Sequence, residues 1–213
     1  MAGPNIAHHT PITVWQTISG NTDNTDAEPE GATQTFLSGT PVSLSSGNII
    51  AWAGTGGGVA AVVAGVSMED AHNLASAGLG APGPFTGIGF PGAGLSFGAV
   101  PNEGSALNIP RGAPFVTGQI LYNRAIDDII FVAQFDNSNG SVAADYTPVQ
   151  ANVGSQFGLT ADSTAPVYWY VDKNKTTAGT NTVVEIVGLH PIDGSIVNAR
   201  VLFKFLRSAS QFL

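Results

Sequence analysis

The expected fold is decided by three runs of sequence: PVYWYVD (residues 166–172), TVVEIVGL (182–189) and NARVLFKFL (198–206). Each run is rich in β-branched and aromatic residues, which fit a pleated, half-buried surface. In the last run Val201, Phe203 and Phe205 share one face, because side chains alternate across a strand. Polar, turn-forming segments, one of them with the pair Asp193-Gly194, separate the runs. The stretch 156–206 therefore predicts a β-meander.

The composition favours a protein that lives in an assembly. The chain has 213 residues, enough for one or two domains with a substantial core, and 43% of them are hydrophobic. Only 10% are charged, whereas about 25% is typical. The surface must therefore be built from small and neutral polar residues. Such a surface costs less to desolvate than a charged one, so it suits contacts with neighbours.

The charge distribution argues against nucleic-acid binding. Residues 1–110 carry seven acidic residues and no Lys or Arg, and the net charge of the chain is −8. A nucleic-acid partner would require a basic patch that displaces counterions. The one basic cluster, Arg200, Lys204 and Arg207, lies on a predicted strand. We interpret it as a solubilising face or as an intersubunit partner for the acidic half.

Several other classes of protein are disfavoured. The chain has no cysteine, which excludes disulfides and thiolate metal sites. The segment MAGPNIAHHT (1–10) lacks the basic and apolar regions of a signal peptide. The longest apolar run, residues 59–66, is far shorter than the roughly 20 residues of a membrane span. We therefore expect a soluble protein, made in a host cytoplasm, with no membrane partner.

The chain order suggests an arm followed by a β-rich domain. Residues 1–35 are polar and read as an extended N-terminal arm with one strand, 12–18, around Trp15. Residues 36–213 read as the β-rich domain, whose first subdomain, 36–77, supplies short strands for a small barrel or sandwich. Within it, residues 68–77 are expected to form a short helix with Ser67 as N-cap.

A long Gly/Pro-rich loop is expected to separate the two β regions. Half of residues 78–101 are Gly or Pro, although Phe85, Phe90 and Phe97 lie among them. Loops of this length are usually functional or stabilised by a partner. We assign the loop to residues 78–105 and the second β region, which ends in the meander, to residues 106–213. The predicted fold class is thus mainly β, a small β-barrel or β-sandwich with an extended N-terminal arm and a long Gly/Pro-rich loop.

No motif predicts catalysis, a cofactor or a metal. The formal GxGxxG pattern GIGFPG (87–92) lacks the flanking strand and helix of a dinucleotide site. The four histidines have no metal-ligand spacing. Asp127 and Asp128 are adjacent, which favours a solvated or capping turn over a catalytic carboxylate pair. We therefore expect a protein that is not an enzyme.

Two sets of phrases resemble a known family. They are GTPVSLSSGNIIAWAG (39–54) with VVAGVSMEDA (62–71), and QFGLTADSTAPVYWYVDKNKTTAGTNTVVEIVGLHPIDGSIVNARVLFKFL (156–206). Both look like head decoration (cement) and related small capsid proteins of tailed bacteriophages. The chain departs from the short members of that family in its N-terminal arm and in the insertion at 78–101.

The resemblance implies a virion structural protein that binds the outer surface of a phage capsid and stabilises the shell. The implied partners are the major capsid protein and further copies of the chain, often as a homotrimer. We expect the arm and loop to carry the contacts, through Ile6, Ile12, Trp15, Phe85, Phe90 and Phe97. Deleting residues 2–20 is then expected to abolish capsid binding without unfolding the barrel. The alternatives are a tail, fibre or receptor-binding module and a small β-fold hydrolase.

Overall fold

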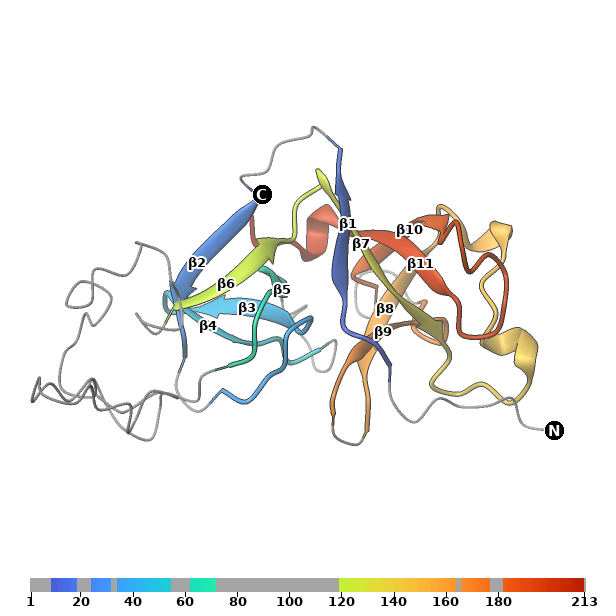
Figure 1. Ribbon diagram of the computed structural model, residues 1–213, viewed down its shortest axis with the longest axis horizontal. Helices are drawn as coiled ribbons and strands as arrows, with labels where there is room; N and C mark the ends of the chain where they lie inside the picture. Colours follow the sequence, from blue (N-terminus) through green and yellow to red (C-terminus); the bar gives the residue numbers. More distant parts are fainter. Residues whose placement is uncertain are drawn as a thin grey trace, which may run out of the picture.

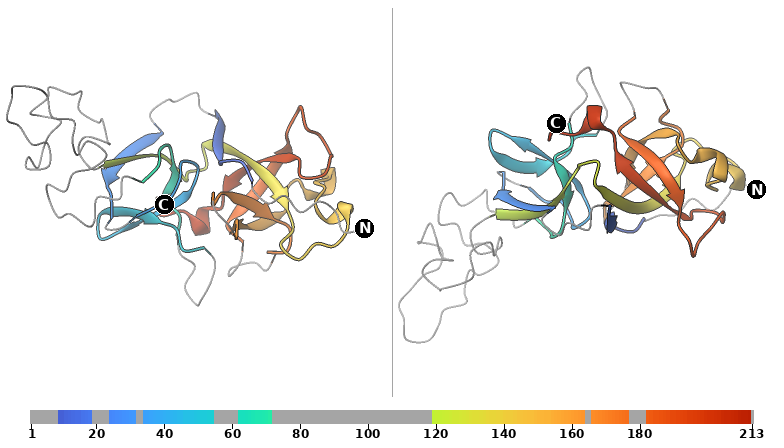
Figure 2. Two further views of the ribbon diagram at one scale, coloured as in Figure 1. Left: turned by 60° about the horizontal axis from the view of Figure 1, so that its bottom comes forward. Right: turned by 90° about the horizontal axis from the view of Figure 1, so that it is seen from above.

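The chain folds into two β units that lie side by side (Figures 1 and 2). The computed structural model describes residues 9–18, 24–31, 34–54, 62–71, 119–163, 166–176 and 182–212. Its strands are β1 (Thr13–Thr17), β2 (Thr25–Pro29), β3 (Pro41–Ser45), β4 (Asn48–Ala51), β5 (Gly65–Ser67), β6 (Gln119–Arg124), β7 (Ile129–Asp136), β8 (Gln156–Ala161), β9 (Trp169–Asp172), β10 (Val184–Leu189) and β11 (Arg200–Phe205). Short 3-10 turns, η3 (Ala143–Asp145), η4 (Gln150–Asn152) and η5 (Arg207–Ala209), complete the described elements. The predicted mainly β class is confirmed.

The larger unit is a five-stranded barrel with one extra strand. Its strands follow the order β7, β11, β10, β8, β9, and a parallel pairing of β9 with β7 closes the ring. Closure leaves no long unpaired edge within the ring, which protects the barrel from pairing with other chains. The sixth strand, β1, pairs antiparallel with β7 outside this ring.

Strands β1 and β9 share one edge of β7. Strand β1 pairs with residues 129–132 of β7, and β9 pairs with Phe135 and Asp136 farther along the same edge. Ile12, just before β1, is 2% exposed and belongs to the barrel core. Gly39, at a φ of +84°, packs against this segment, and a Cβ there would lie 2.8 Å from the Ile12 nitrogen. Residues 11–17 are therefore part of the barrel, and the expectation that deleting residues 2–20 leaves it folded is corrected.

The barrel interior is filled by the inward rows of β7 and β11. Val201, Phe203 and Phe205 are buried on one face of β11, as the alternation predicts. Phe131 of β7 meets them, with ring centroids 5.8 Å from Phe203 and 5.2 Å from Phe205. These aromatic pairs add to the energy of burying their large apolar surface.

The smaller unit is a five-stranded sheet in the order β2, β6, β5, β3, β4. A parallel bridge between Glu30 and Ile49 brings its two edges together, so this sheet also curls on itself. Trp52, which follows β4, belongs to the core of the larger barrel, and its ring lies 5.2 Å from that of Trp169. The two units therefore share one apolar contact region.

The observed strand order differs from the predicted meander, because β8 lies between β9 and β10. Strands β10 and β11 are neighbours as predicted, but β9 pairs with β8 and β7 and not with β10. All four residues of β9 are buried, because this short strand closes the barrel. The predicted helix is also wrong where it is described. Residues 68–71 are not helical, and residues 72–77 lie outside the described residues.

The sheets divide the chain differently from the domains expected from sequence. Strands β1 and β2 come from the expected arm, yet each pairs within a sheet. Strand β6 comes from the expected second region but pairs with β2 and β5 of the smaller sheet. The expected Gly/Pro-rich loop, residues 78–105, lies outside the described residues. Chain order therefore does not separate the two units.

The packing of the core predicts that truncating one buried side chain will lower the free energy of unfolding strongly. Phe131→Ala should lower the free energy of unfolding by about 3–5 kcal/mol, because it removes a buried ring and leaves a cavity. Ile196→Ala is the control: this side chain is 62% exposed and should change stability by less than about 0.5 kcal/mol. Urea unfolding followed by fluorescence measures both. Equal losses in the two variants would contradict the assigned core.

Candidate functional site

One end of the larger barrel carries exposed aliphatic side chains on two of its loops. The β7–β8 loop and the β10–β11 loop lie there, near the point at which the described N-terminal segment begins (Figures 1 and 2). We call this surface the loop end and define it by four exposed residues: Val142, Val149, Ile192 and Ile196. Ile192 is 83% exposed, which is unusual for so apolar a side chain. The backbone N–H of Asn198 donates to the Tyr146 carbonyl at 2.8 Å and holds the two loops together.

The β7–β8 loop is built from local hydrogen bonds. Asn137 starts a turn in which its side chain accepts from the Asn139 N–H at 3.0 Å. The Tyr146 hydroxyl donates to the Gly140 carbonyl at 2.6 Å and anchors the loop to a buried ring. Asp145 accepts from two backbone N–H groups, which lower the pKa of its carboxyl group. The loop is thus ordered by hydrogen bonds within the chain.

The β10–β11 loop is held by an ion pair at its base. Asp193 accepts from Arg200 Nε at 2.7 Å and from Arg200 Nη2 at 2.9 Å, a two-point contact with planar geometry. The Arg200 hydrogen bonds hold the pKa of Asp193 well below its usual range. Gly194, with a φ of +60°, provides the predicted turn. Ile192 and Ile196 project from a loop that is fixed in place.

The loop end is almost free of charge. In residues 137–155 and 191–199 the only charged side chains are Asp145 and Asp193, and both are engaged within the chain. Lys173, which follows β9, adds a charge to this end, and its Nζ donates to the Ala144 carbonyl at 3.1 Å. An apolar surface with few charges costs little to desolvate, so burying it against another protein is favourable. This combination of order, exposure and neutrality is typical of a protein contact surface.

A buried histidine fastens the N-terminal segment beside this end. His9 Nδ1 lies 2.5 Å from Asp162 Oδ1, and His9 Nε2 lies 2.8 Å from Asp136 Oδ2. The ring stacks on Tyr170 of β9 with centroids 4.1 Å apart. The His9 backbone N–H also donates to Asp162 at 3.0 Å. This group, the His9 clamp, spans the place where β1 and β9 share the edge of β7.

The electrostatics of the clamp favour a protonated histidine. Burial lowers the pKa of His9, but the hydrogen bonds to Asp136 and Asp162 and their charges outweigh it, so the pKa lies above its ordinary value. A neutral imidazole has a single N–H and cannot donate to both carboxylates. Burial, together with the charges of Asp172, Asp136 and Asp162, raises the pKa of the Tyr170 hydroxyl. The clamp is therefore an ion triad closed by an aromatic ring.

Trp15 adds an aromatic to the region between β1 and the loop end. A register shift between Val14 and Gln16 marks a bulge in β1, and Trp15 lies within it. The side chain is 40% exposed. Its ring meets the edge of His190, which precedes the β10–β11 loop, with centroids 5.0 Å apart. Trp15 thus joins the N-terminal segment to the base of this loop.

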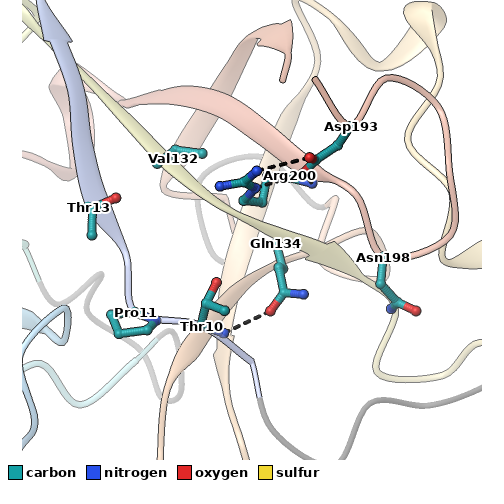
Figure 3. Close-up of a pocket in the computed structure, with 8 residues that line it drawn as sticks. All are labelled: Thr10, Pro11, Thr13, Val132, Gln134, Asp193, Asn198 and Arg200. Carbon is teal, nitrogen blue, oxygen red and sulfur yellow. Dashed lines mark hydrogen bonds and ion pairs between the residues drawn. The ribbon is translucent and has the colours of Figure 1, made fainter. Parts of the chain in front are cut away.

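A pocket of about 310 Å³ lies over the outer face of β7, between the N-terminal segment and the β10–β11 loop (Figure 3). Its lining residues are Thr10, Pro11, Thr13, Val132, Gln134, Asp193, Asn198 and Arg200. The Thr10 N–H donates to Gln134 Oε1 at 2.7 Å, so the N-terminal segment forms one wall. This pocket adjoins the loop end.

The residues predicted to make contacts are only partly brought together. Trp15 is exposed beside the loop end, whereas Ile12 is buried and serves the core of its own chain. Ile6, Phe85, Phe90 and Phe97 lie outside the described residues. Sequence reasoning missed the His9 clamp, because its partners are 127 and 153 positions away. It also missed Ile192 and Ile196, although two isoleucines around an Asp-Gly turn were a visible sign of an apolar loop.

The basic cluster on β11 is used within the chain. Arg200 pairs with Asp193 at 2.7 Å, Lys204 with Glu185 at 3.9 Å, and Arg207 with Asp127 at 3.4 Å. These side chains thus pair with acids of the same subunit, and the intersubunit role stays a prediction. Exposed pairs of this kind contribute little to stability, but they neutralise the surface.

Comparisons with known proteins do not assign the site. No family model, no curated protein and no solved structure matches the chain. Among the described residues, no group of three His, Cys, Asp or Glu side chains has the arrangement of a metal site. In the same part of the chain, no helix has the length and apolar character of a membrane span.

The His9 clamp predicts that alkaline pH loosens the N-terminal segment. The folded-state pKa of His9 lies above 6.5, so its stabilisation is complete below about pH 6.5 and is lost as the pH rises through the folded-state value. Hydrogen exchange of the Thr10 and β1 amides, corrected for the intrinsic effect of pH, should accelerate relative to β11. His9→Gln should exchange fast at every pH. A variant that kept the wild-type pH dependence would contradict the role of His9.

Proposed function

We propose that this protein is a virion structural protein that binds the outer surface of a phage capsid and stabilises the shell, without catalysis. The observation that carries the proposal is the loop end, an ordered and nearly uncharged surface with four exposed aliphatic side chains. Together with the resemblance of residues 39–71 and 156–206 to decoration proteins, it favours a docking role. The partners proposed are the major capsid protein and further copies of this chain, as a homotrimer on the capsid exterior.

Stabilisation would follow from selective binding to the assembled shell. A protein that binds the assembled state but not its free subunits shifts the equilibrium toward the shell by mass action. Each loop end offers few side chains, so one copy binds weakly. Many copies, linked to one another as trimers, sum these weak contacts into a strong one.

Features of the described residues also weigh against the two alternatives. A sugar-binding receptor module would use clustered aromatic platforms, yet Trp15 is the only aromatic among the exposed large hydrophobics of the described ranges. A hydrolase would present its carboxylates in an accessible cleft. The side chains of His9, Asp136 and Asp162 are instead almost completely buried. A structural role fits this arrangement better.

A charge placed on the loop end should abolish shell binding. Ile196→Asp introduces a carboxylate that must be desolvated on docking, and we expect occupancy on undecorated capsids to fall at least about tenfold. Ile18→Asp is the matched control, because Ile18 and Ile196 are each 62% exposed. Ile18 donates its N–H to Asp128, which precedes β7, and so lies toward the opposite end of that strand. Co-sedimentation with capsids measures both variants.

The pattern of results decides the proposal. Loss of binding in Ile196→Asp, with wild-type binding in Ile18→Asp, supports docking through the loop end. Wild-type protein that ignores capsids at micromolar concentration would overturn the proposed function. Equal binding by both variants would show that another surface docks. Circular dichroism establishes that each variant is folded before it is mixed.

A further inference from the structure

The pocket over β7 is rich in hydrogen-bond donors that have no acceptor. Gln134 Oε1 accepts from the Thr10 N–H, and this bond directs Gln134 Nε2 away from the N-terminal segment (Figure 3). Asn198 Nδ2 is buried and has no hydrogen-bond partner within the described chain. Figure 3 shows both amide groups lining the pocket. A buried amide donor without a partner is costly, so the site favours an acceptor from outside.

Arg200 contributes a third donor. Its Nε and Nη2 bind Asp193, whereas Nη1 makes no hydrogen bond among the described residues and points away from Asp193 in Figure 3. The ion pair fixes the guanidinium plane, so this nitrogen is already oriented. Three donors from β7, β11 and the β10–β11 loop therefore line one pocket.

The carboxylate oxygens that line the pocket are already occupied. Asp193 Oδ1 accepts from Arg200 Nη2 and lies 3.3 Å from His190 Nδ1. Asp193 Oδ2 accepts from both Arg200 Nε and the Arg200 backbone N–H. The lining offers no aromatic ring on which a sugar could stack. Three open donors and no free carboxylate among the described lining residues therefore favour a group that accepts hydrogen bonds.

The charge of the site favours a neutral group. Asp193 neutralises Arg200, and the whole chain carries a net charge of −8. An anion entering the pocket would lose its hydration without meeting a net positive charge. A peptide carbonyl accepts hydrogen bonds, donates none and is neutral. Pro11 and Val132 supply an apolar floor for a small side chain beside it.

We propose that this pocket binds the main-chain carbonyl groups of an extended, uncharged peptide segment of a partner protein. Asp193 and Asn198 of the β10–β11 loop line the pocket, and Ile192 and Ile196 lie on the same loop, so a partner seated on the loop end would reach it. The identity of the partner as a shell protein rests on the proposed function. The pocket chemistry is a property of this chain and is tested without any shell.

The test is a titration of the isotope-labelled full chain with N-acetyl-alanine N′-methylamide, followed through the side-chain NH₂ signals of Gln134 and Asn198. We expect saturable shifts with a dissociation constant on the order of millimolar, as suits a probe with few atoms. Acetate and methyl glucoside serve as the anionic and sugar probes at the same concentrations. They should leave these signals in place.

Two isosteric variants test the donors. Gln134→Glu keeps the oxygen that accepts from the Thr10 N–H but replaces the free donor with an acceptor. Asn198→Asp makes the same change at a backbone φ of +57°, which aspartate tolerates. Each should weaken binding of the neutral probe about tenfold or more. Gln150→Glu, on the exposed turn η4, carries the same change of charge and should bind like the wild type.

Several outcomes would overturn the proposal. They are no saturable shift with the amide probe, tighter binding of acetate, tighter binding of the glucoside, or unchanged affinity in both isosteric variants. The result of this titration does not depend on whether the protein binds capsids. A pocket that binds the amide probe in a protein that ignores capsids would uphold this inference and overturn the proposed function.

Discussion

The fold depends on the way two strands share one edge of β7. Strand β9 closes the barrel along the last residues of β7, and β1 covers the first residues of the same edge. The His9 clamp lies where these two pairings meet and ties β7 to the segment that follows β8. Because the edge is completed from the N-terminus, the segment that looks like an arm is a structural part of the barrel. It also forms one wall of the pocket in Figure 3.

Many charged side chains of this protein pair with groups of the same chain. The basic side chains of β11 and of η5 each meet an acid of the same subunit, and the carboxylates of the two loops bind local donors. What remains for contact is an apolar and amide-rich surface. Such a surface binds through shape and through many small contacts, which suits repeated docking on a lattice better than recognition of a charged ligand. The low charge of the chain therefore favours docking because its surface costs little to desolvate.

Local patterns in the sequence predicted part of this structure. The alternation of Val201, Phe203 and Phe205 identified the inner face of β11, and Asp193-Gly194 identified a turn. Alternation does not encode which strands pair, so the parallel closure by β9 and the place of β8 could not be predicted. Nor could the meeting of His9 with Asp136 and Asp162, which is a product of the closed barrel. Ile12 and Trp15 looked alike as apolar arm residues, but the bulge in β1 leaves Trp15 exposed while Ile12 is buried.

The most direct test of the central claim is a cryo-electron microscopy reconstruction of undecorated capsids mixed with the purified chain. The account predicts regular added density in which the loop end, with Ile192 and Ile196, faces the shell and the smaller β unit lies away from that contact. Capsids without added density, or density in which the loop end faces solvent, would contradict it.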